Sequence, residues 1–114
     1  MRDFADVASV ADVPAGELLG VTLPDGVAVC LYNLKGEIGA VSGVCTHAEF
    51  AMSDGVLHAD GTIECVWHGA QFDCRTGAVR RQPATDALPV FDVRVEGGRV
   101  FVAAAASDAG ARTA

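Results

Sequence analysis

Short apolar stretches, broken by turn residues, run through most of the chain, and their side chains alternate with a period of two residues. From residue 27 to residue 32, Val27, Val29 and Leu31 alternate with a second set of side chains that would face the other side of a strand. The same pattern predicts strands over Glu17–Thr22, Val27–Leu34, Ile38–Ser42, Thr62–Val66, Gln71–Asp73, Val90–Val95 and Arg99–Val102. Short strands at this spacing predict an all-β fold, a small antiparallel β-sandwich or barrel.

Glycine-containing turns separate these strands. Asp-Gly occurs at 25–26, 54–55 and 60–61, and Gly97-Gly98 separates the last two strands. Glycine accepts a positive φ without steric cost, so each pair predicts a hairpin or tight turn. Helical periodicity is weak, and Val7–Val13 is expected to form at most a turn or two before Pro14.

The 114 residues are most simply one domain, expected over residues 1–103 and followed by a disordered tail at 104–114 that is rich in small residues. The formal net charge of −7 argues against a nucleic-acid partner. We expect no signal peptide and no membrane-spanning helix, hence a cytoplasmic protein. Four cysteines in a reducing compartment suggest metal or redox chemistry before disulfides.

Two short segments combine a cysteine with a histidine. Cys45 and His47 are followed, after a gap of 17 residues, by Cys65 and His68. Such pairs in two turns predict a metal site. A Cys2His2 zinc site uses the same ligand types, but its cysteines usually sit together in one knuckle. One cysteine and one histidine from each turn suit a two-iron cluster, with both thiolates on one iron and both imidazoles on the other.

The pattern C-T-H-x(17)-C-x-x-H-G is followed by Phe72-Asp73, Thr76-Gly77 and Pro83-Ala84. It resembles the Rieske [2Fe–2S] proteins, and more narrowly the small soluble Rieske ferredoxins of bacterial aromatic-ring-hydroxylating dioxygenase systems. The resemblance implies a Rieske-like sandwich in which a cluster-binding subdomain of two ligand loops spans about residues 43–84.

The resemblance also implies roles for the ligand residues. Cys45 and Cys65 would hold the buried iron, and His47 and His68 the outer iron, where electrons would enter and leave. Gly69 would let backbone N–H groups approach the bridging sulfides. Two further residues, Trp67 and Pro83, would surround the cluster, Pro83 from a third loop; packing of Trp67 against the domain core is the alternative for that side chain.

The resemblance implies a monomeric one-electron carrier between an NAD(P)H-dependent flavoprotein reductase and a terminal oxygenase. The chain is not expected to be an enzyme, because His58 is the one histidine left for the mononuclear iron site of an oxygenase, and no G-x-G-x-x-G follows a strand. Two alternatives remain: a small Rieske-like subunit of assimilatory nitrite reductase, and a zinc-stabilised interaction domain.

Several polar or reactive residues are expected to lie outside the metal site. Cys30 and Cys74 are expected to be packing thiols, with a disulfide between them as the alternative. His58 is expected to be a surface turn residue. Three arginines at 75, 80 and 81 form a basic cluster, expected to be a solvated turn rather than a partner contact.

Overall fold

The computed structural model describes residues 4–44, 51–66, 69–81 and 87–106. These ranges form β-strands and two short 3₁₀ helices. The strands are β1 (Phe4–Ser9), β2 (Leu18–Thr22), β3 (Ala28–Leu34), β4 (Glu37–Ser42), β5 (Val56–Leu57), β6 (Thr62–Glu64), β7 (Gln71–Asp73), β8 (Val79–Arg81), β9 (Val90–Glu96) and β10 (Arg99–Ala106); the helices are η1 (Val10–Asp12) and η2 (Met52–Asp54).

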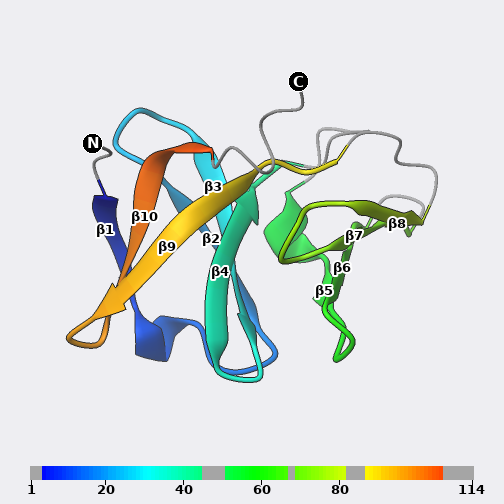
Figure 1. Ribbon diagram of the computed structural model, residues 1–114, viewed down its shortest axis with the longest axis horizontal. Helices are drawn as coiled ribbons and strands as arrows, with labels where there is room; N and C mark the ends of the chain where they lie inside the picture. Colours follow the sequence, from blue (N-terminus) through cyan, green and yellow to red (C-terminus); the bar gives the residue numbers. More distant parts are fainter. Residues whose placement is uncertain (1–3, 45–50, 67–68, 82–86, 107–114) are drawn as a thin grey trace.

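The strands form two antiparallel sheets (Figure 1). The larger has the order β1-β10-β9-β4-β3-β2, and the smaller has the order β5-β6-β7-β8. In Figure 1 the smaller sheet lies at one end of the longest axis, and the hairpin turn between β9 and β10 lies at the other. The predicted all-β antiparallel fold is confirmed.

Strand β3 is buried on both faces, which explains why nearly all of its residues are apolar. Val29 and Leu31 belong to a core inside the larger sheet. Cys30, Tyr32 and Leu34 belong to a second core, which also contains residues of the smaller sheet. The alternation predicted from the sequence is therefore confirmed from residue 29 onward, and β3 is the strand from which both cores are built.

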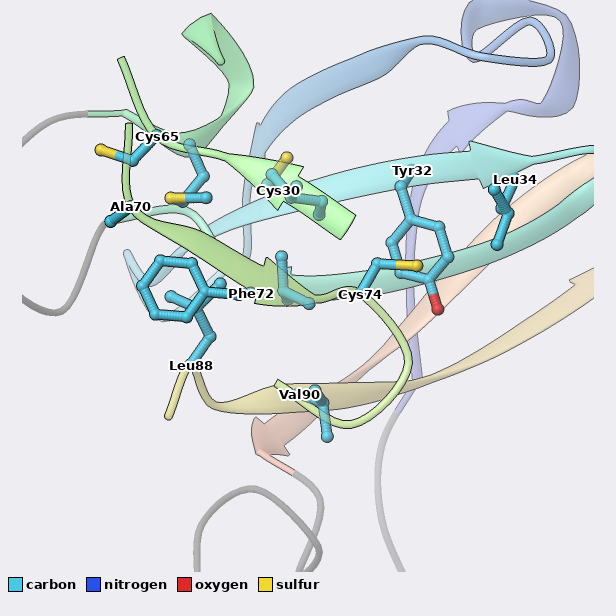
Figure 2. Packing of buried hydrophobic residues seen from close by; sticks show 12 residues of the cluster. Cys30, Tyr32, Leu34, Cys65, Ala70, Phe72, Cys74, Leu88 and Val90 are labelled. Carbon is cyan, nitrogen blue, oxygen red and sulfur yellow. The ribbon is translucent and has the colours of Figure 1, made fainter. Parts of the chain in front are cut away.

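The second core joins the two sheets (Figure 2). Phe72 of β7 and Ile63 of β6 are fully buried in it, together with Val41 of the larger sheet. Burial of large apolar side chains is the main favourable contribution to folding, so this shared core fixes the smaller sheet against the larger one.

Three of the expected turns are confirmed, at Gly26, Gly61 and the pair Gly97-Gly98, all with positive φ. Gly55 differs, because its φ is −86° and it ends η2. A Cβ on Gly55 would collide with the backbone carbonyl of Glu64, so close approach of two backbones explains this glycine.

The expected turn before Pro14 is present as η1, which is capped by Ser9. The strand before it was not predicted: residues 4–9 form β1 against β10. Strands β5 and β8 were not predicted, and β10 continues to Ala106 instead of ending at residue 102. The rest of the expected tail, residues 107–114, lies outside the described residues, and the domain limits remain a prediction.

Within the described ranges, no helix is long and apolar enough to cross a membrane.

Candidate metal centre

The first ligand loop is closed at its base by backbone contacts. Val44 and Ala51 form an antiparallel bridge, and the Met52 N–H donates to the Gly43 carbonyl over 2.9 Å. The predicted ligands Cys45 and His47 lie between these residues and outside the described part of the chain. The bridge brings the two ends of that segment together, as a short ligand loop requires.

The second ligand loop connects β6 to β7 and begins at Cys65. The Cys65 N–H donates to the Ala70 carbonyl over 2.7 Å, which closes the loop as a hairpin. Gly69 has a φ of +72°, a conformation that favours glycine. Cys65 is 1% exposed, and in Figure 2 its sulfur points away from the other labelled side chains. His68 and Trp67 lie outside the described residues.

The bases of the two loops are neighbours. After the first loop the chain passes through η2 into β5, and Val56 pairs with Glu64, the residue before Cys65. Met52 and Cys65 share the core between the sheets. The structure therefore brings the end of one predicted loop next to the start of the other.

The predicted third loop leaves the smaller sheet after β8. Pro83 lies outside the described residues. After this segment the chain returns to the turn between β7 and β8, where the Leu88 N–H donates to the Gly77 carbonyl over 2.8 Å. Leu88 is fully buried in the core between the sheets. The segment with Pro83 thus leaves and returns to the same subdomain as the ligand loops.

Cys65 is the one predicted ligand that the structure describes. Among the described residues, no group of three or more histidine, cysteine or carboxylate side chains is arranged to hold a metal ion. Cys45, His47 and His68 lie outside the described residues. A buried thiol at the base of a hairpin, followed by a glycine in left-handed conformation, is compatible with a thiolate-ligated iron–sulfur cluster.

A group of polar side chains beside the second loop was missed in the sequence. His58 is not a simple surface turn residue: its Nε2 lies 2.8 Å from Glu64 Oε1, and its side chain is 39% exposed. The Gln71 side-chain amide donates to the same oxygen over 3.2 Å. The Asp60-Gly61 turn could have revealed the contact, because a hairpin there brings His58 beside β6.

Cys30 and Cys74 are buried and, within the described part of the chain, form no disulfide. Burial raises the pKa of Cys30 to about 12 and that of Cys74 to about 11. In Figure 2 the Cys74 side chain lies beside the Tyr32 ring, and both residues belong to the core between the sheets. The expectation of packing thiols is confirmed for both residues.

The described arginines of the basic cluster pair within the chain. Arg75 donates through Nε and Nη2 to Glu37 Oε1 over 3.3 and 2.9 Å, and Arg80 lies 2.6 Å from Asp73 Oδ2. More than half of each guanidinium side chain is exposed. These pairs are those of a solvated turn, as expected, and exposed pairs contribute little to stability.

The sequence and the fold define a class of protein. Residues 3–92 match the Rieske [2Fe–2S] domain family, and the chain belongs to this family. It is 43% identical to the ferredoxin subunit of 3-phenylpropionate/cinnamic acid dioxygenase from Escherichia coli, over 82% of this chain and 86% of that protein. It is 40% identical to the ferredoxin component of the p-cumate 2,3-dioxygenase system of Pseudomonas putida, over 90% and 86%.

Solved structures show the same fold at similar length. A ferredoxin from Sphingomonas yanoikuyae B1 matches with a TM-score of 0.84 and 30% identity, over 90% of this chain and all of that one. A chain from the complex of reduced oxygenase and oxidised ferredoxin of carbazole 1,9a-dioxygenase matches with 0.86 and 29%, over 94% and 98%. A protein from Mycobacterium tuberculosis that is assigned as an NADH-dependent nitrite reductase small subunit matches with a TM-score of 0.82 and 26% identity, over 94% of this chain and 99% of that one.

These similarities confirm the predicted family and its cofactor, one Rieske-type [2Fe–2S] cluster. They favour that cluster over the zinc alternative. The named relatives are ferredoxin components, so this chain is an electron carrier of such a system rather than an enzyme in itself.

Proposed function

We propose that the chain carries single electrons from an NAD(P)H-dependent flavoprotein reductase to the terminal oxygenase of an aromatic-ring dioxygenase system. The observation that carries this proposal is the 43% identity to a dioxygenase ferredoxin subunit over most of both chains. We further propose that it acts as a monomer in the cytoplasm, where NAD(P)H supplies electrons to the reductase.

We propose that Cys45 and Cys65 bind one iron and that His47 and His68 bind the other. The buried thiol of Cys65 and the closed bases of both loops support this assignment. When bound, the cluster takes up and releases one electron at a time. Two imidazoles in place of two thiolates raise the potential to roughly −150 to +300 mV, against about −400 mV for plant-type ferredoxins.

In this proposal the protein around the ligands separates one iron from water and leaves the other accessible. Cys65 is 1% exposed and belongs to the same core as the fully buried Ala70 and Phe72, so the protein shields this ligand from water. His47 and His68 would pass the electron at the surface. Gly69, Trp67 and Pro83 would contact or cover the cluster, as the family resemblance implies.

Two exposed valines next to the ligand cysteines support partner docking at this end of the molecule. Val44 is 42% exposed and Val66 is 55% exposed, and each adjoins a predicted ligand cysteine in sequence. Exposed apolar side chains around an electron-transfer site favour a short-lived complex with a partner.

The proposal is tested by reconstitution with the reductase and terminal oxygenase of a dioxygenase system that uses a Rieske ferredoxin. We expect NADH-dependent product formation to require this chain, and Val66→Asn to slow it at least several-fold, with little change in midpoint potential because asparagine adds no charge. Val95→Asn is the matched control, because Val95 is 48% exposed on β9, away from the ligand loops. Equal loss in both variants would contradict docking through Val66.

The nitrite reductase small subunit remains a second candidate, favoured by the structural similarity at a TM-score of 0.82. A nitrite reductase subunit would support NAD(P)H-dependent nitrite reduction by the matching catalytic subunit. If this chain restores that reaction and supports no dioxygenase with its reductase, the dioxygenase assignment is wrong.

A further inference from the structure

Three polar side chains meet at the base of the second ligand loop. Glu64 ends β6 and Gln71 begins β7, and the two residues face each other directly across the strand pair. The Gln71 amide donates to Glu64 Oε1 over 3.2 Å, and His58 Nε2 lies 2.8 Å from the same oxygen. One carboxylate oxygen of Glu64 is thus held from two sides.

The other oxygen of Glu64 lies beside the ligand loop itself. A Cβ placed on Gly69 would be 3.3 Å from Glu64 Oε2, so the carboxylate lies beside the turn that connects the predicted ligands to β7. Glu64 also directly precedes Cys65 in the chain. Its side chain is 32% exposed, so solvent screens its charge only in part.

A carboxylate in this place has two effects on a cluster in the loop. Its hydrogen bonds limit the rotation of the Glu64 side chain, which supports the turn at Gly69. Its negative charge opposes the addition of an electron nearby and therefore lowers the reduction potential. His58 and Gln71 contribute to both effects, because each of them contacts Oε1 of the carboxylate and helps to hold it in this orientation.

We propose that Glu64, held by His58 and Gln71, is a positioning residue of the second ligand loop and lowers the midpoint potential of the cluster. The inference rests on the proposed assignment of Cys65 and His68 as ligands. It does not depend on the partner proteins, because potential and spectrum are measured on the isolated holoprotein.

The charge effect is tested by Glu64→Gln, which keeps the size and an acceptor oxygen. We expect the midpoint potential of Glu64→Gln to be more positive by about 30 to 60 mV. For one electron, this shift corresponds to an increase of about threefold to tenfold in the equilibrium constant for reduction. Glu96→Gln is the matched control, because it removes the same charge from the last residue of β9, where Glu96 Oε2 lies 3.5 Å from Arg94 Nε. In Figure 1 the turn that follows β9 lies at the opposite end of the longest axis from the smaller sheet. A shift in Glu64→Gln no larger than in this control would overturn the proposal.

The positioning effect is tested by His58→Ala in two backgrounds. If His58 acts through the Glu64 side chain, His58→Ala changes the electron paramagnetic resonance line shape of the reduced cluster when Glu64 is present, and has little further effect in Glu64→Ala, which has no acceptor oxygen for His58. Equal changes in both backgrounds would show that His58 acts on the loop by another route, and would overturn the positioning role.

Failure of the ligand assignment gives a different result from failure of this inference. If Cys65 and His68 are not ligands, Cys65→Ser and His68→Ala keep a full Rieske cluster, measured as iron and sulfide content. If they are ligands and Glu64 is not a positioning residue, those two variants lose the cluster while Glu64→Gln keeps both the cluster and the unmodified potential.

Discussion

At the residue scale, hydrogen bonds to Asp73 organise the turn after β7. Asp73 Oδ1 accepts from the N–H groups of Arg75 and Thr76, over 2.9 and 3.2 Å, and Oδ2 accepts from Arg80 over 2.6 Å. Partial burial would raise the pKa of Asp73, but these hydrogen bonds outweigh it and hold the pKa below its usual value. The carboxylate therefore stabilises the fold in its ionised form.

Replacement of Asp73 by asparagine is expected to lower the free energy of unfolding by about 1–2 kcal/mol, because charge-assisted hydrogen bonds are lost. Since the folded-state pKa is depressed, this contribution is complete above the unfolded-state pKa and is lost as the pH falls through the folded-state value. Urea unfolding of the two proteins at pH 7 and near pH 3 measures both effects. If the difference in free energy of unfolding between the two proteins is as large near pH 3 as at pH 7, the role of the ionised Asp73 carboxylate is contradicted. Glu96→Gln is the control for loss of an exposed negative charge elsewhere in the chain.

The buried thiols lead to a prediction about reactivity. Cys30 and Cys74 have pKa values raised by burial to about 12 and about 11, so almost no thiolate forms at neutral pH. We expect iodoacetamide to leave both unmodified in the folded holoprotein and to modify both after denaturation. Peptide mass spectrometry reads this directly, and rapid modification of Cys74 in the folded protein would show that its site opens.

At the element scale, a strand could be predicted where its own residues and the adjoining turn contain the pattern that defines it. The apolar alternation of β3 and the Gly97-Gly98 turn before β10 are local features, so the sequence predicts them. β1 is different, because Phe4 pairs with Ala103 at the other end of the chain, and a local pattern does not contain that contact. β5 has two residues, too few for any period to appear.

A close cross-strand contact between β3 and β4 leaves no room for a side chain at Gly39. Gly39 faces Tyr32 in the register of the two strands, and a Cβ on Gly39 would overlap the phenol ring. We expect Gly39→Ala to reduce the free energy of unfolding by about 1–3 kcal/mol, because the buried ring has to move.

The matched test is a double-mutant cycle with Tyr32→Leu. A shorter side chain at Tyr32 leaves room for the new methyl group at Gly39, so the double variant should lose less stability than the sum of the single variants. Equilibrium urea unfolding measures all four proteins. Strict additivity would contradict the packing of the ring on Gly39.

At the scale of the whole molecule, the proposed ligand set could be identified in the sequence because it lies in two short motifs, whereas its surroundings could not. The spacing of Cys45, His47, Cys65 and His68 is visible in the sequence alone. The Asp60-Gly61 turn indicates that His58 lies beside β6, but the contact of Gln71 with the same Glu64 oxygen depends on the pairing of β6 with β7 and follows only from the folded structure. The burial of Cys65 likewise depends on a core that both sheets share.

The central claim is that one iron of a [2Fe–2S] cluster is bound by two histidines and the other by two cysteines. Pulsed electron paramagnetic resonance of the reduced holoprotein tests it most directly, because it detects nitrogen ligands of the iron that holds the added electron. We predict strong coupling to two histidine nitrogens, lost together with the cluster in His68→Ala. A reduced cluster without nitrogen coupling, or a colourless protein that holds zinc and no sulfide, would contradict the account.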